Sequence, residues 1–146
     1  MRWRKKAICA LFIAIIVLTA CSNERGYRLY YPADDIIAVE ICEVFDNPYS
    51  AASLLPEYEV IYVLSDEQMT QFIEQLSTIE CEEYWNDPLY SIKNYCVIIR
   101  YNNGAREVLS TTGCGIFEEN NGTYNRFYFS ETVFYELISQ YTDIPM

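Results

Sequence analysis

The sequence predicts a small α+β domain in which two helices pack on one face of a mostly antiparallel sheet. Three observations lead to this prediction. Runs rich in β-branched and aromatic residues recur along the chain, two segments place apolar residues at helical spacing, and Asn-Gly dipeptides separate neighbouring apolar runs. Because runs of strands closed by helices are typical of α+β proteins, the expected order is β-β-α-β-β-β-β-α.

The first half of the domain is expected to contain two strands and a helix. Residues 34–46 alternate and are rich in Ile and Val, which predicts a strand, and residues 58–64 predict a second strand after a Pro- and Ser-containing loop. Ser65 then takes the position of a helix N-cap, and Gln68 completes a capping box. The apolar residues that follow at helical spacing are Met69, Phe72, Ile73, Leu76 and Ile79.

The second half is expected to contain two hairpins and a helix. Asn103-Gly104 lies between two apolar runs and is the strongest short signal for a hairpin. A second hairpin is expected to turn at residues 120–122, and Ser130 takes an N-cap position like that of Ser65. The strands are expected within residues 95–112, 115–118 and 123–129, and the apolar residues of the second helix are Phe134, Leu137, Ile138 and Tyr141.

The two helical segments resemble each other. A shift of 65 residues aligns Ser65 with Ser130 and Gln75 with Gln140. Two explanations stay open: an internal β-β-α duplication, or the general similarity of strand–cap–helix junctions.

The first 20 residues have the pattern of a secretory signal peptide. Four basic residues, Arg2, Arg4, Lys5 and Lys6, precede the uncharged apolar residues 7–20. This run of about 14 residues is short of the roughly 20 that a membrane-spanning helix needs, and it ends in small residues. A signal peptide is therefore favoured over a membrane-anchoring or buried helix.

The tetrapeptide Leu18-Thr19-Ala20-Cys21 resembles the lipobox of bacterial lipoproteins. The resemblance implies cleavage before Cys21 and a covalent diacylglyceryl lipid on its thiol, which anchors the protein to the extracytoplasmic face of the cell membrane. It divides the chain into a signal peptide (1–20), a lipidated N-terminus and tether (21–33) and one acidic domain (34–146). The loop YWNDP (84–88) and the turn YNNG (101–104) also resemble small uncharacterised lipoproteins of Gram-positive, clostridial-type bacteria, a resemblance that implies no activity.

Composition excludes several functions. After Cys21 the chain holds six Lys and Arg against 21 Asp and Glu, a net charge of −15, so a nucleic acid is not expected as a partner. The chain has no histidine, which removes the usual general base and the commonest metal ligand. The carboxylates are scattered over turns and helix starts. A carboxylate-based hydrolase is therefore not expected, nor a metal or a cofactor other than the lipid.

Two functions remain. The first is a non-catalytic module of the cell envelope that binds a protein or peptide through loop aromatics and sheet edges, with Tyr84, Trp85, Asn86 and Asp87 as candidate contact residues. In the other interpretation of this loop, Trp85 folds back into the core. The alternative function is an accessory lipoprotein that handles a sugar, peptide or cation for a transporter or the cell wall, with or without a hydrolytic step.

The four remaining cysteines are Cys42, Cys81, Cys96 and Cys114, and an extracytoplasmic location permits disulfides. Hairpin register places Cys96 near Thr111, and therefore near Cys114, while Cys81 could reach either. Cys42 is expected to be a small buried hydrophobic residue. The pairing stays open, as does the alternative of four reduced thiols.

Overall fold

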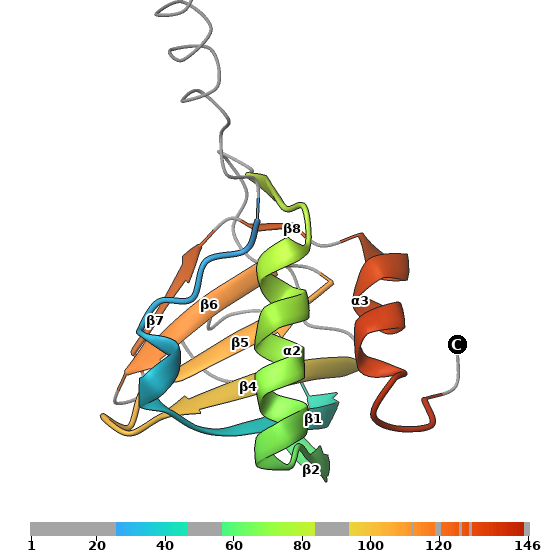
Figure 1. Ribbon diagram of the computed structural model, residues 1–146, viewed down its shortest axis with the longest axis horizontal. Helices are drawn as coiled ribbons and strands as arrows, with labels where there is room; N and C mark the ends of the chain where they lie inside the picture. The colour runs from blue at the N-terminus through green and yellow to red at the C-terminus, as the bar shows by residue number, and fades with distance from the viewer. Residues whose placement is uncertain are drawn as a thin grey trace, which may run out of the picture.

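The computed structural model describes residues 26–46, 57–83, 94–111, 113–118, 121–125, 127–128 and 130–144. They form a six-stranded sheet, a second sheet of two short strands, and two α-helices (Figure 1). The elements are η1 (Ala33–Asp35), β1 (Ile36–Asp46), β2 (Glu57–Val63), α2 (Asp66–Thr78), β3 (Glu82–Glu83), β4 (Tyr95–Tyr101), β5 (Arg106–Ser110), β6 (Gly113–Glu118), β7 (Asn121–Asn125), β8 (Phe127–Tyr128) and α3 (Glu131–Ile138). The predicted α+β class is confirmed.

The large sheet has the order β2-β1-β4-β5-β6-β7, and every neighbouring pair is antiparallel. The small sheet pairs β3 with β8. Both helices lie on the same face of the large sheet (Figure 1), because their apolar residues share one buried cluster with alternate residues of the strands. The paired strands β1 and β2, and the paired strands β6 and β7, lie at opposite edges of the sheet. An internal duplication remains a prediction.

Local capping explains where the helices begin. The Ser65 hydroxyl accepts the N–H of Gln68 at 3.4 Å, and the Gln68 side chain accepts the N–H of Ser65 at 2.9 Å, so the predicted capping box is present. The Ser130 hydroxyl accepts the N–H of Val133 at 3.2 Å. Because a valine at that position has no polar side chain to return the bond, this cap is one-sided.

The two predicted hairpins are present. The Gly104 N–H donates to the Tyr101 carbonyl at 3.0 Å, and Gly104 has a φ of +86°, a conformation that glycine adopts without strain. In the second hairpin, Phe117 pairs with Gly122 and Glu118 with Asn121. This register puts Gly122 inside β7, so the expected turn at residues 120–122 lies slightly too late in the sequence.

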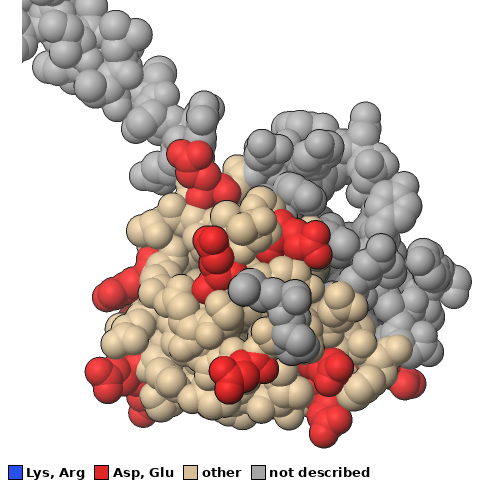
Figure 2. Space-filling model, turned by 90° about the vertical axis from the view of Figure 1, so that its right-hand side faces the viewer, with Lys and Arg blue, Asp and Glu red and all other residues tan. Residues whose placement is uncertain are grey.

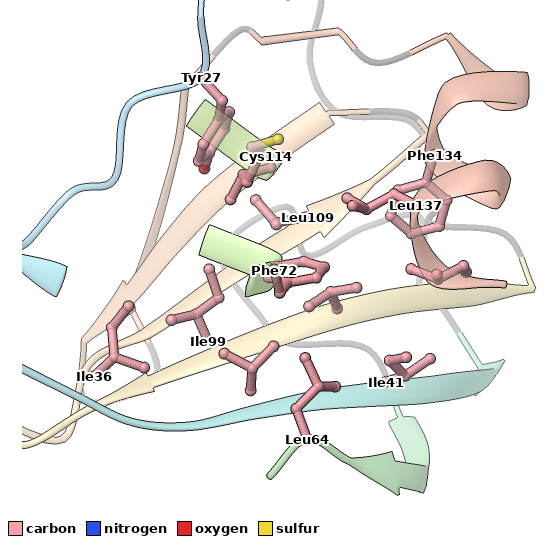
Figure 3. Packing of buried hydrophobic residues seen from close by; sticks show 14 of the residues in the cluster. Tyr27, Ile36, Ile41, Leu64, Phe72, Ile99, Leu109, Cys114, Phe134 and Leu137 are labelled. Atoms are coloured by element: carbon pink, nitrogen blue, oxygen red, sulfur yellow. The ribbon is translucent and has the colours of Figure 1, made fainter. Parts of the chain in front are cut away.

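The helix-facing core runs the length of the sheet (Figure 3). Phe72 of α2 and Phe134 of α3 are 0% and 1% exposed, and Figure 3 shows Phe72 among the strand residues Ile99 and Leu109 and Phe134 next to Leu137. A smaller cluster lies on the other face of the sheet. Its fully buried members are Cys42, Cys96, Ile98 and Val108.

The N-terminal described segment is part of this core. Tyr27 is 5% exposed, and its N–H donates to the Ile79 carbonyl at 3.2 Å. A Cβ atom on Gly26 would lie 2.3 Å from the carbonyl oxygen of Ser77, so the close approach requires glycine. The expected tether of residues 21–33 is therefore corrected: from Gly26 onward the chain packs on the domain, which does not begin at residue 34.

Candidate functional site

The aromatic loop singled out from the sequence lies outside the described residues. This applies to all four of its candidate contact residues, Tyr84, Trp85, Asn86 and Asp87, and also to Cys21. Their role stays a prediction.

Three of the exposed large apolar side chains among the described residues lie on the β2 edge, defined here as Val60, Ile61 and Val63. Val60 and Ile61 are each 38% exposed, and Val63 is 54% exposed. The neighbouring strand β1 adds Ile37 and Phe45, which are 63% and 62% exposed. Natural proteins usually protect edge strands with charges, prolines or short lengths. A seven-residue edge strand with three exposed apolar side chains is thus a candidate contact surface.

Backbone N–H and C=O groups on this edge are oriented to pair with a further strand. Strand β2 is the last strand of the described sheet on its side. The Leu64 N–H donates to the Val39 carbonyl at 3.0 Å, and Val63 is opposite Glu40. Because hydrogen-bonding direction alternates along an antiparallel strand, the N–H and C=O of Val63 point away from β1. Ile61 falls at a β-bulge and has no partner in β1.

The charges around the β2 edge are acidic. Glu57 and Glu59 of β2 are both exposed. In the described part of the chain, the Lys and Arg residues are three arginines, Arg28, Arg100 and Arg106. Figure 2 shows the side of the molecule on which α3 lies, with Asp and Glu scattered over it and no Lys or Arg in view. Such a field attracts basic partners and repels acidic ones.

A second group of polar residues is buried where the N-terminal segment packs on the sheet: the tyrosine–glutamate cluster, defined here as Glu107, Tyr27 and Tyr101. Glu107 is 0% exposed, and both tyrosine hydroxyls donate hydrogen bonds to its carboxylate. The N–H of Tyr30 donates to Oε2 of Glu107 at 3.2 Å. Three donors thus satisfy a charge that would otherwise be costly to bury.

Burial dominates the electrostatics of this cluster. Desolvation raises the pKa of Glu107, and the three hydrogen bonds lower it by less. Desolvation also raises the pKa of Tyr27 well above its ordinary value. Because Glu107 has no exposed surface, it cannot touch a substrate in this conformation. Its role is to fix the N-terminal segment on the domain.

The other face of the sheet carries an ion pair. Nε of Arg100 lies 2.8 Å from Oε1 of Glu40, and Arg100 also donates to the Tyr58 hydroxyl at 3.4 Å. The second oxygen of Glu40, Oε2, is buried and has no hydrogen-bond partner among the described residues. The hydrogen bond that Arg100 donates to Glu40 raises the pKa of Arg100.

The cysteines are distributed over both faces of the sheet. Cys96 is directly opposite Cys42 in the β1–β4 register, and both belong to the smaller cluster. Cys114 lies in the helix-facing core, and Cys81 packs against that core. The expectation that Cys96 and Cys114 are near neighbours is wrong, because they lie on opposite faces with β5 between their strands. All four are free thiols in the structure.

Sequence reasoning missed the tyrosine–glutamate cluster, although a signal for it existed. Glu107 and Leu109 of β5, and Ala105 just before it, share one face by the two-residue period of a strand. An acid between two apolar residues on a buried face requires partners. Nothing in the sequence indicated that one of them would come from Tyr27.

Among the described residues, no group of three or more Cys, Asp and Glu is placed to hold a metal ion. No helix within the described ranges is long and apolar enough to cross a membrane. Comparison with protein-family models, with curated proteins and with solved structures finds no match to the chain.

Proposed function

We propose that this protein is a lipid-anchored module on the extracytoplasmic face of the cell membrane, and that it binds a basic, extended segment of another envelope protein along β2. The observation that carries this proposal is the exposure of Val60, Ile61 and Val63 on an edge strand. The module is non-catalytic: it acts by holding its partner near the membrane.

Strand addition fits the β2 edge. In this mode of recognition, a partner segment adds a strand to an exposed edge, main-chain hydrogen bonds supply affinity, and alternate side chains supply specificity. The outward N–H and C=O of Val63 would meet the partner's backbone. Val60 and Ile61 would meet its apolar side chains, while Glu57 and Glu59 would attract its Lys or Arg residues.

The N-terminal segment supports the same arrangement. With a lipid on Cys21, only residues 22–25 would separate the anchor from Gly26, a reach of at most about 18 Å. Gly26 is bridged to Glu80, just beyond the C-terminal end of α2, whereas β2 leads into the N-terminal end of α2. The helix has 13 residues and is about 20 Å long, so the β2 edge would be kept clear of the membrane surface.

Site-specific photocrosslinking of the full-length chain in cells tests the binding proposal. A photoreactive residue replaces Ile61 on β2 or, as a matched control, the exposed Gln71 on α2. We expect a discrete protein adduct from position 61 and none from position 71. The adduct should disappear with Val63→Pro, which removes an outward N–H, and persist with Val63→Thr.

Two outcomes would overturn this proposal. One is the absence of an adduct from position 61, and the other is an equal adduct from both positions. Circular dichroism of each variant shows whether it is folded, so that loss of the adduct is not mistaken for unfolding.

The anchor is tested separately. We expect metabolic labelling with a radioactive fatty acid to mark the wild-type chain and the protein to fractionate with membranes. Cys21→Ala should abolish the label, whereas Cys81→Ala should leave it in place. Label on the Cys21→Ala chain would contradict the lipobox interpretation.

A further inference from the structure

We propose that Cys42 and Cys96 form a disulfide bond that joins β1 to β4 in the exported protein. The inference rests on the proposed function in one respect, because an extracytoplasmic location supplies the oxidising compartment that structural disulfides need. The pairing itself follows from the fold.

Register brings the two cysteines together. Cys42 and Cys96 are Cα partners in the β1–β4 ladder. The Val44 N–H donates to the Asn94 carbonyl at 2.8 Å in the same register, so by alternation the cysteines occupy a hydrogen-bonded pair. The Cα atoms of such pairs are about 5.5 Å apart, inside the 4.4–6.8 Å range that disulfides span. Their side chains point to the same face of the sheet. The Cβ atoms of opposite residues are about 4.5–5.5 Å apart, so the two strands must approach until this distance is about 4.5 Å or less for the bond to close.

Packing holds the two thiols against each other. Both cysteines are 0% exposed and share a cluster with Ile98 and Val108, which are 0% and 1% exposed. The Cys42 Sγ donates a weak hydrogen bond to the Glu40 carbonyl at 3.8 Å. A side-chain hydrogen bond between the two cysteines is the largest cause of the raised pKa of Cys42, followed by burial.

This environment determines when the bond can form. The thiolate is the reactive form of cysteine, and a buried thiol with a raised pKa is inert. Oxidation therefore precedes the burial of the pair, while the newly exported chain is still folding.

Thiol–disulfide exchange balances the reaction. A thiolate of the pair attacks a disulfide of an exported dithiol oxidoreductase and forms a mixed disulfide. The second cysteine of the pair then displaces the enzyme's thiolate. The chain loses two protons and two electrons in total, and the disulfide of the oxidoreductase takes them up to become two thiols.

The fold excludes the competing pairings of these two residues. Cys114 packs in the helix-facing core, on the other face of the sheet from Cys42 and Cys96. Cys81 packs against the same core as Cys114. A bond from either of them to Cys42 or Cys96 would have to pass through the sheet.

The bond would close a loop of 55 residues, counted from Cys42 to Cys96 inclusive, that contains both β2 and α2. Closing a long loop stabilises a fold mainly by restricting the unfolded chain. Because β1 is the neighbour of β2, the bond would also fix the strand on which the β2 edge is built.

The test is the thiol state of the full-length protein from cells. Cells are quenched in acid, free thiols are alkylated under denaturing conditions, and proteolytic peptides are mapped without reduction by mass spectrometry. We expect a Cys42–Cys96 cross-linked peptide that disappears on reduction, and a thermal unfolding midpoint that falls on reduction. Cys81→Ala, the matched control, should retain both properties, whereas Cys96→Ala should lose them.

Recovery of Cys42 and Cys96 as alkylated thiols would overturn the inference, and so would a bond from either of them to Cys81 or Cys114. The N-terminal peptide of the same sample reports lipidation. A lipidated chain with free thiols refutes the disulfide alone, and a bridged chain without lipid refutes the anchor alone. The two proposals thus fail separately.

Discussion

The Tyr27 hydroxyl donates a hydrogen bond to Oε1 of Glu107, although 80 residues of chain separate the two. Tyr27 is 5% exposed and Glu107 is 0% exposed, so this contact is closed to water. It attaches the segment that follows the candidate lipidation site to the middle of the sheet. Four predictions come from this contact, from the segment it holds and from the opposite face.

Tyr27→Phe should lower the free energy of unfolding by about 1–3 kcal/mol, because it leaves a buried carboxylate without one of its donors. Equilibrium unfolding in urea measures the change. The control is Tyr31→Phe, which removes a hydrogen bond to the exposed Glu118 and should lower the free energy of unfolding far less. Equal costs for the two variants would show that the Tyr27–Glu107 contact is energetically unimportant.

Glu107 should make stability depend on pH. Because burial raises its pKa in the folded protein above the ordinary 4.5, the folded state binds the proton more tightly than the unfolded chain. Its contribution to the free energy of unfolding is therefore fully present below the ordinary pKa and is lost as pH rises through the raised pKa. Many other acids titrate in the same region, so the measured quantity is the difference between wild type and Glu107→Gln in unfolding experiments from acid to neutral pH. Identical pH dependence of the two proteins would refute this role for Glu107.

Gly26→Ala should displace the N-terminal segment from α2. The new Cβ would meet the Ser77 carbonyl oxygen at 2.3 Å, and overpacking of this kind costs about 1–3 kcal/mol. Hydrogen exchange of the Tyr27 amide, which is bonded to the Ile79 carbonyl, provides a local measurement. Protection should fall in Gly26→Ala and persist in Ala33→Ser, a change at an exposed position. Unchanged protection in both variants would contradict the close packing.

The ion pair between Arg100 and Glu40 should contribute little to the free energy of unfolding. Removing only one of its two charges should nevertheless lower that free energy. Arg100→Met leaves a Glu40 carboxylate whose side chain is only 12% exposed, at a cost of about 1–3 kcal/mol. The double variant Arg100→Met, Glu40→Leu should recover most of that loss, because an apolar pair needs no partner charge. A double-mutant cycle from urea unfolding gives the coupling energy. A double variant as unstable as Arg100→Met would contradict this interpretation.

Local signals predicted the elements well, because each depends on a few adjacent residues. The Ser65 and Ser130 caps and the Asn103-Gly104 turn are present where expected. The predictions were wrong for features whose position depends on pairing with another strand. The turn of the second hairpin was misplaced because the pairing of Phe117 with Gly122, and not the Asn-Gly signal, decides the register.

The candidate site was less predictable. The apolar run that includes Val60, Ile61 and Val63 has the pattern of a strand that is buried on both faces. In the structure the strand lies at the edge of the sheet, and these side chains are therefore exposed. Cys42 alone is indistinguishable from any small apolar residue, and its partner Cys96 is 54 residues away. The aromatic residues singled out beforehand lie outside the described part of the chain.

The sequence by itself determined the acidic charge, the absence of histidine, the α+β class, and the lipobox-like tetrapeptide near its start. Each of these is a property of composition or of a few neighbouring residues. Only the tertiary structure decided which strand forms an edge, that Tyr27 donates a hydrogen bond to Glu107, and that Cys42 is opposite Cys96. Strand order and register are set by the joint packing of the whole core, and no single segment encodes its neighbour.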